Sequence, residues 1–256
     1  MSSLKDYPST VSSKILLVGD SGAGKTSTIA SMVEAGFEVF VADCDNGLSV
    51  LMNHLPADKL DRVRFLTFRD RGTGKPDAGQ RRREMVSTKG WIEGQENYGK
   101  LDSWDSNRVF VLDSLTFAGK AAINFTLHLN NKNIESQVSQ AEWGDAARHI
   151  ENMISHLTSD HIKCHVVVMT HLRYIEDDAS GLVSAFPTCV GARLPTIIPR
   201  YFNDMYLVKR GKDGKIKLRS APNGQIMLKS SRPNLIEPEG EADIGKLIKL
   251  LNSENK

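Results

Sequence analysis

Residues 19–26, GDSGAGKT, constrain the fold of this chain more than any other stretch. They fit the pattern G-x-x-x-x-G-K-[ST] in full, and they follow an apolar run at residues 14–19 (KILLVG) and open a segment expected to be helical to about Ala35. A strand, a glycine-rich turn and a helix in this order place backbone N–H groups and a helix N-terminus around phosphate oxygens. The alternative is an accidental glycine-rich turn, and a strand before it and a helix after it make that alternative much weaker. The sequence therefore predicts an α/β domain with a phosphate loop, the name used below for residues 19–26.

The residues of the phosphate loop have separate expected roles. Lys25 supplies a positive charge to the β- and γ-phosphates of a nucleotide, and Thr26 supplies a hydroxyl to Mg²⁺. The predicted nucleotide-binding residues are Gly19, Asp20, Ser21, Gly22, Ala23, Gly24, Lys25, Thr26 and Ser27.

Another apolar run is followed directly by Asp113, in the segment VFVLDS. Taken alone, an aspartate after such a run is equally well explained as a helix N-cap. With the phosphate loop upstream, the stronger interpretation is a carboxylate that holds Mg²⁺. Thr26 and Asp113 are therefore the predicted metal ligands, and ATP and Mg²⁺ are the expected cofactors.

Two more carboxylates, Asp43 and Asp45, lie in VADCDNGLS at the end of an apolar run. A calcium loop of the EF-hand type is excluded, because counting from Asp43 puts Gly47 at the fifth ligand position and His54 at the twelfth. What remains is a strand end near the phosphate loop, where a carboxylate can orient or deprotonate an attacking water. The residues alone leave open which of the two carboxylates takes this role; the family resemblance given below implies Asp45, with Asp43 supporting the turn.

Along the chain, apolar runs alternate with segments of helical spacing, which favours a mostly parallel sheet with antiparallel strands at the C-terminal edge. The expected strands are residues 14–19, 37–43, 62–68, 108–116, 165–171, 202–210, 215–220 and 225–231, and the expected helices are 25–35, 47–55, 115–129, 141–157 and 241–254. The domain prediction is a flexible N-terminus (1–13), one core (14–236) and a C-terminal helix (237–256).

Two stretches lack convincing periodicity. Residues 69–107 are predicted to be a partly mobile insertion, and their basic part, 69–83, is interpreted either as a solvated loop or as a phosphate-backbone contact for single-stranded DNA. Residues 172–200 are predicted to lack regular elements and to form a DNA-binding loop. Cations and rings that suit such a loop are Arg173, Arg193, Arg200, Tyr174, Phe186 and Tyr201.

The composition is that of an ordinary soluble protein. Charged residues make up 25% of the 256 residues, and the formal net charge is only +2, which excludes a histone-like polycation. The three cysteines lie far apart, which argues against a structural zinc and fits a reducing cytoplasm, of a phage host or another bacterium. No apolar run approaches the roughly 20 residues of a membrane helix, so no membrane partner is expected.

These motifs resemble the RecA-like core of the P-loop ATPases. There the strand after the phosphate-loop helix ends in Asp-x-Glu, and DCD matches it with Asp45 at the position of the water-activating glutamate. MTH lies where the family carries a polar pair that senses the γ-phosphate, which makes Thr170 and His171 candidates. The segment WGDAARHIENMISHL resembles the helix after the family's first DNA-binding loop, and residues 172–200 take the place of the second loop.

Within this AAA-type ATP-binding group, the chain looks most like small phage-encoded RecA-core ATPases implicated in single-strand annealing and recombination. These carry a late Lys-x-x-Arg-like segment, which KSSRP matches with Lys229 and Arg232. The resemblance implies that these cations reach a neighbouring subunit's nucleotide.

The resulting functional expectation is a Mg²⁺-dependent ATPase that binds single-stranded DNA and promotes annealing or homologous recombination. The resemblance implies a homo-oligomer, a ring or a filament, and a single-strand DNA-binding protein as a further partner. One alternative is an ATP-dependent switch or assembly factor with slow hydrolysis, which the short side chain of Asp45 favours. Another is a DNA helicase or loader motor.

Overall fold

The computed structural model describes residues 12–68 and 101–253. Within these ranges the main element is an eight-stranded sheet with the order β10-β9-β8-β1-β5-β4-β2-β3. The strands from β8 to β3 are parallel, and β9 and β10 are antiparallel to their neighbours. The fold class predicted from the sequence is thus confirmed. The sheet strands are β1 (Lys14–Val18), β2 (Glu38–Asp43), β3 (Val63–Thr67), β4 (Arg108–Asp113), β5 (His165–Thr170), β8 (Asp204–Arg210), β9 (Ile216–Arg219) and β10 (Glu239–Glu241).

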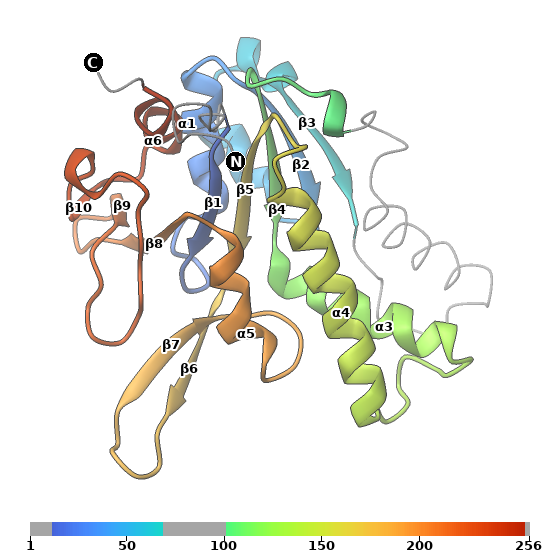
Figure 1. Ribbon diagram of the computed structural model, residues 1–256. Coiled ribbons are helices and arrows are strands. Elements are labelled where there is room, and N and C mark those ends of the chain that lie inside the picture. Colours follow the sequence, from blue (N-terminus) through green and yellow to red (C-terminus); the bar gives the residue numbers. More distant parts are fainter. Residues whose placement is uncertain (1–11, 69–100, 254–256) are drawn as a thin grey trace, which may run out of the picture.

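Helices cover both faces of the sheet (Figure 1). One face packs against α1 (Ile29–Glu34) and α6 (Ile244–Leu251), and the other against α3 (Leu115–Leu129), α4 (Gln140–Leu157) and α5 (Leu194–Ile197). Because side chains alternate along a strand, a strand buried on both faces must be apolar throughout. In β1, Ile15 and Leu17 pack on the α1 side, whereas Leu16 and Val18 pack on the α4 side.

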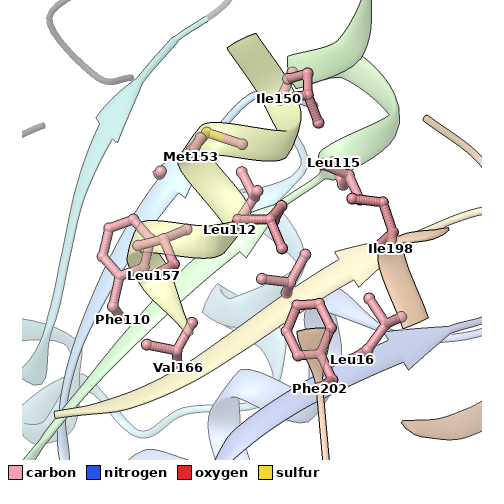
Figure 2. Packing of buried hydrophobic residues seen from close by; sticks show 14 of the residues in the cluster. Leu16, Phe110, Leu112, Leu115, Ile150, Met153, Leu157, Val166, Ile198 and Phe202 are labelled. Atoms are coloured by element: carbon pink, nitrogen blue, oxygen red, sulfur yellow. The ribbon is translucent and has the colours of Figure 1, made fainter. Parts of the chain in front are cut away.

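The larger core lies between the sheet and α4. Figure 2 shows Phe110 and Leu112 of β4 beside Met153 and Leu157 of α4. The helix begins with a capping box, in which the Ser139 hydroxyl accepts a hydrogen bond from the Glu142 N–H and the Glu142 carboxylate accepts one from the Ser139 N–H.

Trp143, in the first turn of α4, is 39% exposed. The buried line of α4 starts at Ala146, one turn later, and Glu142 is the residue of the first turn that is buried. The Glu142 carboxylate is compensated there by Lys132, whose ammonium lies 2.8 Å away. The first turn of α4 therefore serves the capping interactions and not the apolar core.

The prediction that residues 172–200 have no regular element is wrong. They contain a hairpin of β6 (Leu172–Glu176) and β7 (Val183–Pro187), followed by α5. Figure 1 shows the hairpin extending away from the sheet beyond the end of β5. All residues of β6 except Leu172 are exposed, so the strand lacks the apolar alternation that burial imposes.

The C-terminal part of the chain differs from the sequence prediction in three further features: one predicted strand is absent, one strand was not predicted, and the last helix begins later. Residues 225–231 form no regular strand, only an isolated bridge between Met205 and Lys229. Residues 239–241 form β10, and α6 begins at Ile244 because the Asp243 carboxylate caps it by accepting a bond from the Lys246 N–H.

The end of the expected insertion 69–107 belongs to the core, since Leu101 and Trp104 are buried and the Trp104 ring lies 4.4 Å from that of Phe40. The basic part of the insertion lies outside the described residues, and so do residues 1–11 of the expected flexible N-terminus. Ser13 continues β1, because its carbonyl accepts a hydrogen bond from the Val166 N–H. None of the helices in the described ranges has the length and apolarity to span a bilayer.

Candidate functional site

The candidate site lies at the carboxyl ends of the parallel strands, where open α/β sheets bind ligands. The register aligns Asp43 of β2 with Asp113 of β4, Asp113 with Met169 of β5, and Val18 of β1 with Thr170 of β5. The phosphate loop follows β1 directly. Residues from four strand ends therefore meet at one edge of the sheet.

The phosphate loop packs closely against β8, which is parallel to β1, and against the antiparallel strand β9. A Cβ atom on Gly19 would lie 2.4 Å from the carbonyl oxygen of Val208 in β8, and one on Gly24 would lie 2.6 Å from Ile216 of β9. Gly24 also has a φ of 97°, in the left-handed region that favours glycine. Both positions thus require glycine because neighbouring strands approach too closely for a Cβ atom. Gly24 is required for its backbone conformation as well.

Lys25 is held inside this loop. Its side chain is buried, and its ammonium group donates hydrogen bonds to the carbonyl oxygens of Gly19 at 2.8 Å and Asp20 at 3.0 Å. Burial lowers the pKa of Lys25, and the charges of Asp113, Asp45 and Asp20 oppose that shift. The ammonium is therefore a buried cation that is bonded to two loop carbonyls and lies within the electrostatic influence of three carboxylates.

Thr26 and Asp113 are in direct contact, with the Thr26 hydroxyl donating to Oδ2 of Asp113 at 2.6 Å. Burial raises the pKa of Asp113 to about 6; Asp45 and Asp43 add to this shift, whereas the Thr26 hydroxyl and Lys25 oppose it. Among residues 12–68 and 101–253, no group of three or more His, Cys, Asp or Glu side chains has the arrangement of a protein-only metal cage. A hydroxyl and a carboxylate in contact nevertheless fit Mg²⁺, which takes few protein ligands and completes its shell with phosphate oxygens and water.

The turn after β2 places Asp43 and Asp45 differently. Asp43 is buried, and its Oδ1 accepts a hydrogen bond from the Asn46 N–H at 2.7 Å, while Asn46 takes a φ of 58°. The Cys44 N–H donates to the Asp113 carbonyl at 2.6 Å, which fixes the turn to the end of β4.

Asp45, in contrast, is half-buried and turned toward the start of α3. Its Oδ1 accepts a hydrogen bond from the Ser114 hydroxyl at 2.8 Å. Ser114 occupies the N-cap position of α3, but its side chain makes no capping bond there. Ser114 was not among the predicted site residues, although its place directly after Asp113 was the available signal.

His171 lies near the same carboxylates. Its Nδ1 is 3.1 Å from the Thr116 hydroxyl, and burial followed by the charge of Lys25 lowers its pKa, against the influence of Asp45 and Asp20. The Thr170 hydroxyl donates to the Thr188 carbonyl at 2.6 Å and is therefore engaged with the segment after β7. Thr116 was also missed; its position three residues after Asp113, in the first turn of α3, was the only signal.

Residues 12–181 match the model of a family described as AAA domain, and this match covers more than half of the chain. The chain belongs to this AAA domain family. The coarser part of the sequence prediction is thereby confirmed, namely an ATP-binding domain of the P-loop ATPase class.

Solved structures similar to this AAA domain include a prototypical ATPase from the type III secretion system of pathogenic bacteria and the RadB recombinase. The first is 13% identical, with a TM-score of 0.46, and covers 77% of this chain and 51% of its own. The second is 16% identical, with a TM-score of 0.40, and covers 83% of this chain and 84% of its own. This AAA domain thus spans about half the length of the secretion ATPase. No curated protein matches it.

Lys229 and Arg232, which follow the residues matched by the family model, lie at the other end of the sheet. Lys229 pairs with Met205 near the start of β8, and β8 runs parallel to β1, so this point is opposite the phosphate loop. Arg232 donates to the carbonyl oxygen and hydroxyl of Ser253. The structure therefore does not bring these two cations to the phosphate loop of their own chain.

The residues expected to bind DNA are dispersed. Arg173, Arg193 and Arg200 are exposed, and Phe186 is half-buried. The Tyr201 hydroxyl donates to the Glu151 carboxylate at 2.8 Å, and the Tyr174 hydroxyl donates to Asp20 of the phosphate loop. Both tyrosines thus have partners within the chain, and one of them connects the hairpin with the candidate site.

Proposed function

We propose that this AAA domain is a Mg²⁺-dependent ATPase whose water-activating residue is Asp45. The observation that carries the proposal is the convergence of Lys25, Thr26, Asp113 and Asp45 at one sheet edge, with Thr26 and Asp113 2.6 Å apart. Thr26 and Asp113 would hold Mg²⁺, which neutralises charge on the nucleotide phosphates when bound. The residues of the chain supply the remaining functions.

In this proposal Lys25 exchanges its carbonyl partners for phosphate oxygens, because its ammonium is already confined to the loop. Asp45 accepts a proton from the attacking water or orients it, and the Ser114 hydroxyl fixes the direction of the carboxylate. In the same proposal His171, which Thr116 holds through Nδ1, would donate a hydrogen bond to the terminal phosphate. The short side chain of Asp45 favours slow turnover.

We further propose single-stranded DNA as the partner that stimulates hydrolysis during annealing or recombination. The exposed guanidinium groups of Arg173, Arg193 and Arg200 support this assignment, because phosphate contacts dominate such binding. Head-to-tail contact between copies would bring Lys229 and Arg232 of one chain toward the phosphate loop of the next, since they lie at opposite ends of the sheet. A homo-oligomer is therefore part of the proposal.

One observation favours the switch or assembly factor as a second candidate. The tip of the β6–β7 hairpin carries Glu176, Asp177 and Asp178, and exposed Ile175 and Leu182 lie beside them. Hydrogen bonds from the Ser180 hydroxyl and nearby backbone N–H groups lower the pKa of Asp177, so the tip is negatively charged at neutral pH. An acidic tip repels DNA phosphates, whereas an acidic and apolar tip suits a protein partner.

Phosphate release measured with and without oligo(dT), over a range of salt concentrations, tests the leading proposal. We expect DNA-stimulated turnover that requires Mg²⁺ and that Lys25→Ala abolishes. Lys163→Ala is the matched control, because this exposed lysine donates to the carbonyl of Asp160 far from the phosphate loop.

Full turnover in Lys25→Ala would refute the ATPase assignment. Turnover that oligo(dT) does not change, with no DNA binding below physiological salt, would refute the DNA-dependent function and leave the switch as the supported candidate.

A further inference from the structure

The β6–β7 hairpin makes a contact with the phosphate loop that the proposed hydrolysis does not use. Tyr174 is half-exposed on β6, yet its hydroxyl lies 3.2 Å from both carboxylate oxygens of Asp20. The two residues are 154 positions apart in sequence. A side chain on an exposed strand is thus directed at the second residue of the phosphate loop.

The base of the hairpin is fixed to the same site. The Thr188 N–H donates to the His171 carbonyl at 2.7 Å, and the Thr188 carbonyl accepts from the Thr170 hydroxyl. These bonds tie the residue after β7 to the two residues before β6, so both strands of the hairpin are anchored at the end of β5. Tyr174 is thereby held near the edge of the sheet. Its hydroxyl remains a donor at neutral pH, since burial and the charge of Asp20 raise its pKa.

Asp20 also lies close to the cation that binds phosphate. The Lys25 ammonium donates to the Asp20 carbonyl at 3.0 Å, and the charge of the Asp20 carboxylate acts on Lys25. A carboxylate in this position can pair with the ammonium and compete with nucleotide phosphates for it, and it also repels them. A hydroxyl that engages both carboxylate oxygens restrains the carboxylate from turning inward.

We propose that Tyr174 is a positioning residue that holds the Asp20 carboxylate away from Lys25 and so keeps the lysine available for nucleotide phosphates. The inference rests on the proposed function in that the ligand is ATP. It assigns the hairpin a role in nucleotide affinity that is independent of any DNA or protein partner. The effect should appear in KM and not in kcat, because Tyr174 acts on ground-state binding through Asp20.

The test is a set of four proteins: the unmodified chain, Tyr174→Phe, Asp20→Asn and the double variant. We expect Tyr174→Phe to raise KM for ATP, and Kd for a fluorescent ATP analogue, by about 3- to 10-fold with kcat unchanged. Asp20→Asn removes the competing charge, so adding Tyr174→Phe to it should change KM by less than about 2-fold. Tyr201→Phe is the matched control, because it also removes a hydroxyl bond to a carboxylate, that of Glu151, away from the phosphate loop.

The outcomes separate this inference from the proposed function. If the unmodified chain fails to bind the analogue, the proposed function itself fails. If it binds the analogue and Tyr174→Phe matches Tyr201→Phe in KM and Kd, the positioning role is overturned. A rise in KM that persists at full size in the Asp20→Asn background would likewise overturn it, because the effect would not pass through Asp20.

Discussion

The hydroxyl of Thr26 lies 2.6 Å from Oδ2 of Asp113, although the two residues are 87 positions apart. The contact joins the last residue of the phosphate loop with the end of β4, and it brings together the two oxygen donors that suit Mg²⁺. Taken alone, Thr26 can be explained as an ordinary helix residue and Asp113 as a helix N-cap. Their contact is what supports a shared metal site.

We expect Thr26→Val to lower Mg²⁺-dependent ATP turnover by at least about 10-fold, because valine keeps the shape of threonine but removes the hydroxyl. Thr26→Ser retains the hydroxyl and should stay within a few-fold of the unmodified chain. Steady-state phosphate release over a Mg²⁺ titration measures both. Equal losses in the two variants would show that side-chain packing, and not the hydroxyl, is responsible.

The hydrogen bond from Ser114 to Asp45 predicts a graded loss of hydrolysis. Asp45→Asn should abolish turnover while binding of a fluorescent ATP analogue survives, since the carboxylate acts on water and not on the nucleotide. Ser114→Ala should lower kcat by about 2- to 10-fold, which corresponds to one hydrogen bond that orients the carboxylate. Single-turnover kinetics measure the effect, and a hydrolysis rate for Ser114→Ala equal to that of the unmodified chain would contradict the orienting role of Ser114.

The phosphate loop and the end of β4 could be predicted because both rest on local patterns. An apolar run that ends in a polar residue marks a buried strand and its carboxyl end, and parallel strands bring these ends to one edge. For this reason Lys25, Asp45 and Asp113 could be placed in one site from sequence. The alternation of strands and helices also gave the layers of the fold.

Other features depend on partners that are remote in sequence. The roles of Thr116 and Tyr174 follow from His171 and Asp20, and no spacing rule connects these pairs. The β6–β7 hairpin escaped prediction because β6 is exposed and carries no burial pattern. Ser114 escaped it because a serine after an aspartate normally indicates a cap. Lys229 and Arg232 require a second chain before any catalytic role can be evaluated.

The packing of α4 predicts a contrast between two of its large apolar residues. Ile150 is fully buried against the sheet, so Ile150→Ala should lower the free energy of unfolding by about 2–5 kcal/mol. Trp143, on the first turn of the same helix, is 39% exposed, and Trp143→Ala should cost less than about 1 kcal/mol. Urea denaturation followed by circular dichroism compares them, and a larger loss in Trp143→Ala would contradict the packing described for α4.

Buried His165 predicts that stability falls in mild acid. Its Nδ1 accepts a hydrogen bond from the Ser13 N–H at 3.0 Å, and burial together with Lys14 lowers its pKa to about 4. Below the ordinary histidine pKa near 6.5 the unfolded chain takes up a proton that the folded chain refuses until about pH 4. Stability is therefore lost as pH falls between these values, by roughly 2 kcal/mol at pH 5.

His165→Asn removes this titration while its amide oxygen can still accept the bond from Ser13. The difference in unfolding free energy between the unmodified chain and His165→Asn should therefore shift by about 2 kcal/mol in favour of the variant between pH 7.5 and pH 5. Urea titrations at each pH measure the shift. His161→Asn is the control, because His161 is exposed in the turn that precedes β5, and the unfolding free energy of this variant should change with pH as that of the unmodified chain does. Parallel pH profiles for His165→Asn and the unmodified chain would show that His165 takes up its proton equally in both states, against the buried acceptor role assigned to it.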